Sequence, residues 1–162
     1  MAETTTIRIA TLSDLAAVDA LLARAYPRLL AKHYPPSLRV MAVPHLARAQ
    51  PALLASGRYY LAVNGTGQVL GAGGWSPSRR KEHADIRHFV TDDRHVRRGI
   101  GREIMERIFA DVKAAGIARL DCLATRMAVP FYGAMGFAEL GPVRINLGPG
   151  IDFPAVRMQR TL

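Results

Sequence analysis

The chain has few of the features that mark several large classes of protein. Its one cysteine, Cys122, cannot form an internal disulfide, and nothing here requires an oxidising compartment. No stretch approaches the roughly 18 consecutive apolar residues of a membrane span, and no basic segment followed by an apolar run begins the chain. The five histidines show no spacing typical of metal ligands. These absences favour a cytoplasmic protein with no membrane segment and no metal.

Acidic residues are also scarce, with 13 Asp and Glu against 22 Lys and Arg, and a formal net charge of +9. Such an excess favours an anionic partner, for which coenzyme A and nucleic acid are both candidates, although a surface that is merely basic fits as well. The basic clusters at 79–81 and 97–102 are short. No helix-turn-helix or aromatic RNA-binding pattern accompanies them, so nucleic acid is the weaker candidate.

The length of 162 residues and the apolar content of 49% suit one soluble domain that spans residues 1–162. Alternation and turn residues predict strands at 7–10, 58–63, 68–75, 85–91 and 119–124, with closing strands at 137–140 and 155–159. Apolar spacings of three and four predict helices over 15–29, which Pro27 ends or kinks, over 100–115 and over 128–135. Four prolines cut residues 33–57 into short helical pieces. The order predicts a mixed α/β sheet, antiparallel at first, with a parallel crossover around the 100–115 helix.

The segment Arg97-Arg98-Gly99-Ile100-Gly101-Arg102 joins a predicted strand to a long helix. Amides of a helix's first turn have no internal partners and carry partial positive charge, so they can bind phosphate. Gly99 and Gly101 let a diphosphate approach the backbone, and the arginines add charge. The third glycine of a dinucleotide fingerprint and the Gly-Lys-Ser/Thr of a P-loop are both missing. Alone, the Gly-x-Gly is also compatible with an ordinary tight turn.

This segment resembles the acetyl-CoA signature Gln/Arg-x-x-Gly-x-Gly/Ala of the GNAT superfamily of N-acetyltransferases, with Val96 at the position of Gln or Arg. A second segment, 125–137, is similar to the family pattern Asn-x-x-Ala-x-x-Phe-Tyr-x-x-x-Gly-Phe, with Thr125 in place of Asn. The resemblance covers residues 58–140 well. It implies a mostly antiparallel central sheet flanked by helices, with a splayed pair of central parallel strands.

The resemblance implies acetyl transfer from acetyl-CoA to a primary amine of a small molecule or peptide, by direct attack. The family's tyrosine at Tyr132 would be the general acid at the coenzyme sulfur, although a core aromatic is the plainer interpretation. Amides of Phe89 and Val90 would hold the thioester and its developing negative charge. The residues implied to bind the cofactor are Phe89, Val90, Arg97, Arg98, Gly99, Ile100, Gly101, Arg102 and Thr125.

The general base is less well defined. Some family members carry an acidic residue 14 positions before the first glycine of the loop, which here is Asp85. A slip of one residue would turn the side chain to the other face of the sheet, so Glu82 and His88 remain open, with a water relay behind any of them. Asp85 could equally be a solvent-facing charge at a strand start. Cys122, in an apolar strand, is more typical of a buried small side chain than of a nucleophile.

The acceptor should be read by residues 26–57, by the loop at 76–84 and by the closing strands. The basic loop at 79–81 could favour an acidic acceptor. A homodimer is compatible with the resemblance, but the residues do not indicate one. Two other hypotheses remain: a basic nucleic-acid-binding protein, and an acyl-CoA-binding regulatory domain without turnover, which the presence of Tyr132 disfavours.

Overall fold

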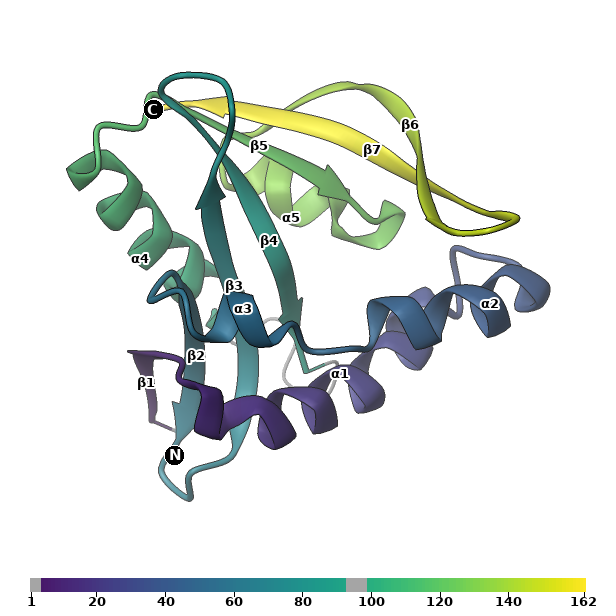
Figure 1. Cartoon of the computed structure of the whole chain (residues 1–162), viewed down its shortest axis with the longest axis horizontal. Helices are drawn as coiled ribbons and strands as arrows, with labels where there is room; N and C mark the ends of the chain where they lie inside the picture. The colour runs from purple at the N-terminus through teal and green to yellow at the C-terminus, as the bar shows by residue number, and fades with distance from the viewer. Residues whose placement is uncertain (1–3, 93–98) are drawn as a thin grey trace.

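The computed structural model describes residues 4–92 and 99–162. It forms a seven-stranded sheet with helices on both faces (Figure 1). The strand order is β1-β2-β3-β4-β5-β7-β6. The strands are β1 (Thr5–Ile9), β2 (Tyr59–Asn64), β3 (Val69–Pro77), β4 (His83–Thr91), β5 (Arg119–Ala124), β6 (Ala138–Gly148) and β7 (Ile151–Thr161). All neighbours are antiparallel except β4 and β5, which are parallel and joined through a helix, so the predicted fold class is confirmed.

In the described part of the chain, five α-helices cover the sheet. They are α1 (Leu15–Leu30), α2 (Pro36–Leu46), α3 (Pro51–Leu54), α4 (Ile100–Ala114) and α5 (Val129–Ala134). α2 and α3 each begin at a proline, the residue best tolerated at the first helical position, so prolines do divide residues 33–57 into short helices. α1, by contrast, continues through Pro27 to Leu30, and the predicted end at the proline is wrong.

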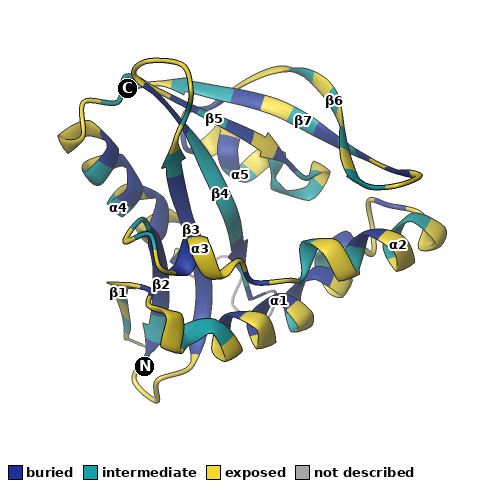
Figure 2. Ribbon diagram, in the orientation of Figure 1, coloured by how far each residue is buried: buried dark blue, intermediate teal, exposed yellow. Residues whose placement is uncertain are grey.

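Two apolar clusters lie on opposite faces of the sheet. Alternate residues of β2 supply them, with Tyr59 and Leu61 packed against α1 and α2, and Tyr60 and Ala62 packed against α4 and α5. Because both faces are covered, β2 and β3 are almost continuously buried (Figure 2). The predicted apolar stripe of α4 is the buried one: Ile100, Ile104, Met105, Ile108, Phe109 and Val112.

The closing strands are much longer than predicted. β6 and β7 are 11 residues long each and form a hairpin around a turn at residues 149–150, where the sequence predicted two short strands. Pro142 and Pro154 resemble loop residues, but β6 is an edge strand and can hold a proline. β5 pairs with β7 only as far as Val156, so Pro154 lies where β7 has no neighbour on that side.

Candidate active site

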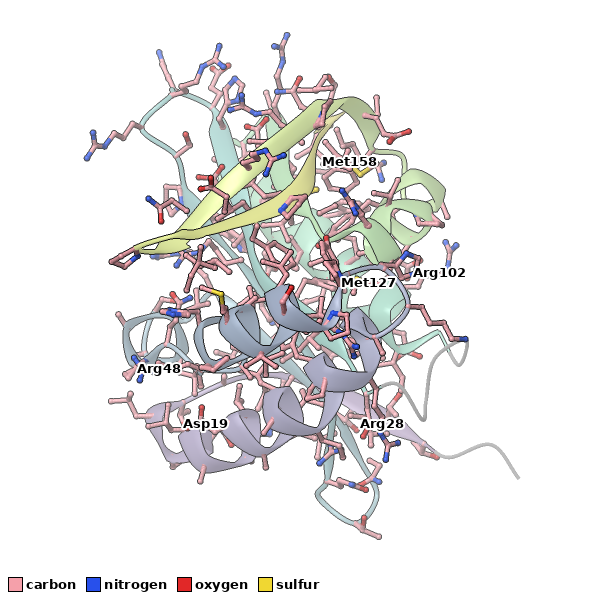
Figure 3. All side chains as sticks on the ribbon, turned by 90° about the vertical axis from the view of Figure 1, so that its right-hand side faces the viewer. Asp19, Arg28, Arg48, Arg102, Met127 and Met158 are labelled. Atoms are coloured by element: carbon pink, nitrogen blue, oxygen red, sulfur yellow. The ribbon has the colours of Figure 1, made fainter. Side chains whose placement is uncertain are left out.

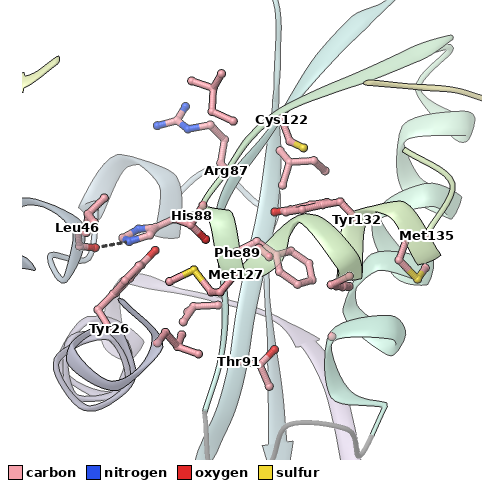
Figure 4. A pocket seen from close by; sticks show the side chains of 18 of the residues that line it. Tyr26, Leu46, Arg87, His88, Phe89, Thr91, Cys122, Met127, Tyr132 and Met135 are labelled. Atoms are coloured by element: carbon pink, nitrogen blue, oxygen red, sulfur yellow. Dashed lines mark hydrogen bonds between the residues drawn. The ribbon is translucent and has the colours of Figure 1, made fainter. Parts of the chain in front are cut away.

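The central feature of the site is the divergence of β4 from β5. The two parallel strands pair only from His83↔Arg119 to Asp85↔Asp121 and then separate. A cavity of about 920 Å³ occupies the opening, and both strands line it (Figure 4). This volume lies within the range of small-molecule and cofactor sites. The splayed pair of parallel strands predicted from the resemblance is therefore present.

β4 carries a bulge at the opening. His88 and Phe89 together face the single residue Gly73, because Arg87 pairs with Gly74 and Val90 with Ala72. His88 adopts a φ of 47°, and the Tyr59 hydroxyl donates to its carbonyl at 2.8 Å. A bulge removes local amides from the regular ladder. It lies where the sequence predicted the amides of Phe89 and Val90 to act, and both residues line the cavity.

The start of α4 forms one side of the cavity. Gly99 precedes the helix with a φ of 78°, a conformation that glycine adopts without strain. The hydrogen bond from Glu103 N to Gly99 O (3.0 Å) is the first of the helix. The amides of residues 100–102, which come before it in the chain, therefore have no helical partner. A Cβ on Gly101 would lie 3.2 Å from the Phe131 ring, so a side chain there would crowd the site. Gly99, Ile100, Gly101 and Arg102 all line the cavity, whereas Arg97 and Arg98 lie outside the described residues.

α5 brings Tyr132 to the same side. Its ring is buried among Phe89, Phe131 and Phe137, with centroid separations of 6.2, 5.5 and 5.3 Å. Within the described chain the hydroxyl has no hydrogen-bond partner, although it borders the cavity. Burial raises the pKa of Tyr132 well above that of an ordinary tyrosine, so the phenol is a proton donor at neutral pH. Thr125, which directly follows β5, also lines the cavity. We call the residues of segments 99–102 and 125–135 that line the cavity the α4–α5 wall.

The opposite side comes from distant parts of the chain. α1, α2 and the link after α2 supply Tyr26, Leu29, His45, Leu46 and Gln50, and the β6–β7 hairpin supplies Ile145, Leu147 and Phe153. We call this set the hairpin wall. The hairpin lies over α1 and α2 (Figure 3). It is held there by the Tyr34 hydroxyl, which donates to Pro154 O at 2.7 Å, and by stacking of Tyr34 on Phe153. Residues from the segment 26–57 therefore reach the cavity. The hairpin residues that line it lie outside the closing strands predicted at 137–140 and 155–159, and none of the fully described loop 76–84 lines it.

The three candidate bases occupy different places. Glu82 is exposed at the tip before β4 and lines neither cavity. Asp85 is the last residue at which β4 pairs with β5. It lines a second cavity of about 430 Å³, together with Asp121 and Arg157. Burial, and then the charge of Asp121, raise the pKa of Asp85. This smaller cavity shares Ile86, Arg87, His88, Cys122 and Leu123 with the large one, so a chain of waters could connect them.

His88 lines both cavities. Its Nε2 lies 2.8 Å from Leu46 O, and because a carbonyl only accepts, Nε2 carries the proton (Figure 4). Nδ1 is buried without a partner in the described chain. Burial lowers the pKa of His88, so the ring is neutral near pH 7. With its carbonyl bonded to Tyr59 and its ring bonded to α2, His88 fixes the bulge in place.

The divergence of β4 from β5, the bulge on β4 and the start of α4 are the features expected of an acyl-CoA-binding fold. Comparison with known proteins agrees with this interpretation. The family model of the acetyltransferase (GNAT) domain matches residues 40–162, and the chain belongs to this family. No curated protein matches it in sequence. The chain is therefore an N-acetyltransferase that uses acetyl-CoA as donor.

Solved structures share the fold at low identity. A GCN5-related N-acetyltransferase from Rhodopseudomonas palustris has a TM-score of 0.82 at 18% identity, covering 100% of this chain and 99% of its own. The PaiA N-acetyltransferase from Thermoplasma acidophilum, in complex with coenzyme A, has a TM-score of 0.75 at 14% identity, covering 98% and 99%. The ribosomal-protein-S18-alanine N-acetyltransferase from Escherichia coli has a TM-score of 0.65 at 19% identity, covering 98% and 94%.

Two further findings concern metals and membranes. Among residues 4–92 and 99–162, no group of three His, Cys, Asp or Glu side chains is arranged to hold a metal ion. In the same ranges, no helix has the length and apolarity to cross a bilayer.

The residues present fit acetyl-CoA. Gly101 leaves the helix start open to a phosphate, Arg102 adds positive charge beside it, and the hydroxyl of Tyr132 has no hydrogen-bond partner among the described residues. What sequence reasoning missed is Arg87 and the residues that the β6–β7 hairpin contributes to the cavity. These residues are separated by up to 120 positions from the elements they touch, as in the Tyr34–Pro154 bond, and no short motif encodes such pairs.

Proposed function

We propose that the protein transfers an acetyl group from acetyl-CoA to a primary amine of a small molecule or peptide by direct attack, with Tyr132 as the general acid. The observation that carries this proposal is the buried Tyr132 hydroxyl, which has no hydrogen-bond partner in the described chain and borders the cavity across from the β4 bulge. Bound acetyl-CoA supplies the thioester whose carbon accepts the amine and whose sulfur leaves.

The chain's own groups divide the proton and charge transfers. Amides of Phe89 and Val90 at the bulge stabilise the negative charge that develops on the acyl oxygen. The Tyr132 hydroxyl gives its proton to the leaving sulfur, and its raised pKa keeps that proton in place until then. The amides of residues 100–102 hold the diphosphate, with Arg97 and Arg98 proposed beside them and Thr125 at the end of β5.

Asp85 is the proposed base, acting through water in the smaller cavity. An incoming ammonium must lose a proton before its nitrogen can attack. The raised pKa of Asp85 makes it a stronger base than an exposed aspartate, and it faces the residues that both cavities share. His88 Nδ1 is covered by protein, which argues against direct contact with an amine.

Direct attack is favoured over a covalent acetyl-enzyme. Cys122 is the only cysteine, and it lies beside Tyr132 at the cavity. Burial raises the pKa of its thiol to about 12, so the reactive thiolate is absent near neutral pH. A double-displacement route through this residue therefore lacks its nucleophile.

The test is release of free coenzyme A in the presence of a panel of amines, for the wild type and for Tyr132→Phe. We expect turnover with some amines and a loss of about 100-fold or more in kcat for the variant, with little change in acetyl-CoA affinity. Equal kcat in the two proteins would remove Tyr132 as the acid. Absence of coenzyme A release with every amine would overturn the proposed activity.

A further inference from the structure

Arg87 differs from three arginines of the described chain that are paired with acidic side chains. Arg8, Arg24 and Arg107 each contact a carboxylate, at 2.8, 2.9 and 3.1 Å. Arg87 contacts only neutral groups: its Nη1 donates to Ser76 Oγ at 3.1 Å and its Nη2 to Gln50 Oε1 at 2.7 Å. In the described chain it has no acidic partner within ion-pair distance.

The position of Arg87 gives this charge a role. It directly precedes the bulge on β4 and lines the large cavity beside Gln50. The Gln50 and Ser76 side chains hold two of the five guanidinium N–H groups, so the planar fork is oriented while other donors remain. An oriented guanidinium with free donors is the group best suited to binding a carboxylate.

The rest of the cavity supports an anion there and opposes a second cation. Within the described ranges, no Asp or Glu lines the large cavity; its ionisable residues are Arg87, Arg102, Cys122, two histidines and two tyrosines. Arg102 lies at the α4 start, on the other wall. A polyamine would place an ammonium here without a carboxylate to pair with, at a cost in desolvation.

Apart from His45 and Gln50, the side chains of the hairpin wall are aliphatic or aromatic. Around Arg87 and Gln50 it presents Tyr26, Leu29, Leu46, Ile145, Leu147 and Phe153. Such a surface fits a hydrocarbon or aromatic body rather than a sugar or a chain of polar groups. Asp85 and Asp121 line the smaller cavity, which Arg87 also borders, and neither of them lines the hairpin wall.

We infer that the acceptor is an amine that also carries a carboxylate and an apolar body, as an apolar amino acid does, and that Arg87 binds the carboxylate. This inference rests on the proposed function, since it names the acceptor of that same site. It also distinguishes a free amino acid from a peptide N-terminus, whose first residue has no carboxylate of its own.

The test compares matched amines in the coenzyme A release assay: L-leucine, L-leucinamide and isoamylamine, which share one apolar body, with spermidine as a polycation. Phenylalanine with its amide, and 6-aminohexanoate, repeat the comparison with a ring and with a longer spacing. We expect kcat/KM to favour the carboxylate over the amide by about 10- to 100-fold, the range of a charge-assisted bond.

Three variants assign this preference to Arg87. Arg87→Gln should bring the leucine-to-leucinamide ratio close to one, mainly through KM for leucine. Gln50→Glu should also lower the ratio, because it places a carboxylate against the guanidinium without changing the side chain's size. Arg79→Gln, on the exposed loop before β4, removes the same charge far from the cavity and should leave the ratio unchanged.

The ratio is insensitive to a partial loss of folded enzyme, because both substrates share it. A wild type that prefers leucinamide, isoamylamine or spermidine would overturn the inference and leave acetyl transfer intact. A carboxylate preference that survives Arg87→Gln would overturn the role of Arg87. Lack of turnover with every amine would overturn the proposed function itself.

Discussion

The two walls of the cavity are built in different ways. The α4–α5 wall comes from two short neighbouring segments, 99–102 and 125–135, and works largely through backbone: a left-handed glycine, free amides and an open Gly101. The hairpin wall collects side chains from α1, α2 and the β6–β7 hairpin. A wall made of backbone tolerates few changes, whereas a wall of side chains can change its specificity one residue at a time. The donor site is therefore expected to be common to the fold, and the acceptor site particular to this chain.

The largest expected effect concerns Asp85, which lines the smaller cavity and belongs to neither wall. Asp85→Asn should lower kcat/KM near neutral pH by about 100-fold, the lower end of general-base contributions. Because burial and Asp121 raise the pKa of Asp85, the acidic limb of the wild-type profile should lie above the pH at which an exposed aspartate titrates. The limb should be lost in Asp85→Asn.

A control for that profile is available in the neighbouring strand. Asp121→Asn removes the charge that helps to raise the pKa of Asp85, so the acidic limb should move to lower pH while activity persists. If the limb is unchanged in Asp85→Asn and is lost in His88→Asn, the base is His88 and not Asp85.

The next effect separates the walls. Gly101→Leu places a side chain where a Cβ already lies 3.2 Å from Phe131, so acetyl-CoA affinity should fall by about 10- to 100-fold in calorimetry, the equivalent of 1–3 kcal/mol of overpacking. Gly133→Leu on α5, where a Cβ meets no atom within 4 Å, is the matched control and should bind normally. Equal losses in the two variants would show that the effect is one of folding.

The reciprocal change is Leu147→Ala in the hairpin wall. It removes apolar surface from the acceptor side only, so kcat/KM for the acceptor should fall by about 5- to 50-fold, as for lost methylenes in a hydrophobic pocket. The dissociation constant of acetyl-CoA should stay within about twofold of the wild type, since the residue is far from the helix start. A matching loss of acetyl-CoA affinity would mean that the two walls do not act separately.

The smallest effect lies outside both walls. Hydrogen bonds from Arg8 lower the pKa of Asp14 from 3.8 to about 2. The pair therefore stabilises the fold at pH values above the pKa of Asp14 in the unfolded state, and this contribution is lost as the pH falls toward 2. Asp14→Asn should reduce the free energy of unfolding by roughly 0.2–1 kcal/mol at neutral pH, as for surface pairs. Denaturant titration should show the difference vanishing below about pH 2, with kinetics unchanged throughout the neutral range.

Sequence reasoning predicted the α4–α5 wall well because local chemistry determines it. Gly99 and Gly101 announce a helix start, and the buried stripe of α4 follows its apolar spacing. The part that the β6–β7 hairpin plays in the hairpin wall was not predicted, because Pro142 and Pro154 interrupt the strand pattern of the hairpin. Only the order of strands in the sheet shows why these prolines are tolerated. Arg87 was not predicted as a site residue because its orientation depends on Gln50 and Ser76, which contact it only in the folded chain. Spacing in the resemblance pointed to Asp85 as a candidate base, but it did not predict that Asp85 lines the smaller cavity and not the large one.

The most direct test of the central claim is calorimetric titration of the protein with acetyl-CoA, repeated with Gly101→Leu. The divergence of β4 from β5, the bulge and the start of α4 predict one saturable site per chain, with a dissociation constant below about 1 mM. The variant should bind acetyl-CoA clearly more weakly. Absence of binding up to about 1 mM, or equal binding by the variant, would contradict the assignment of the α4–α5 wall as the donor site.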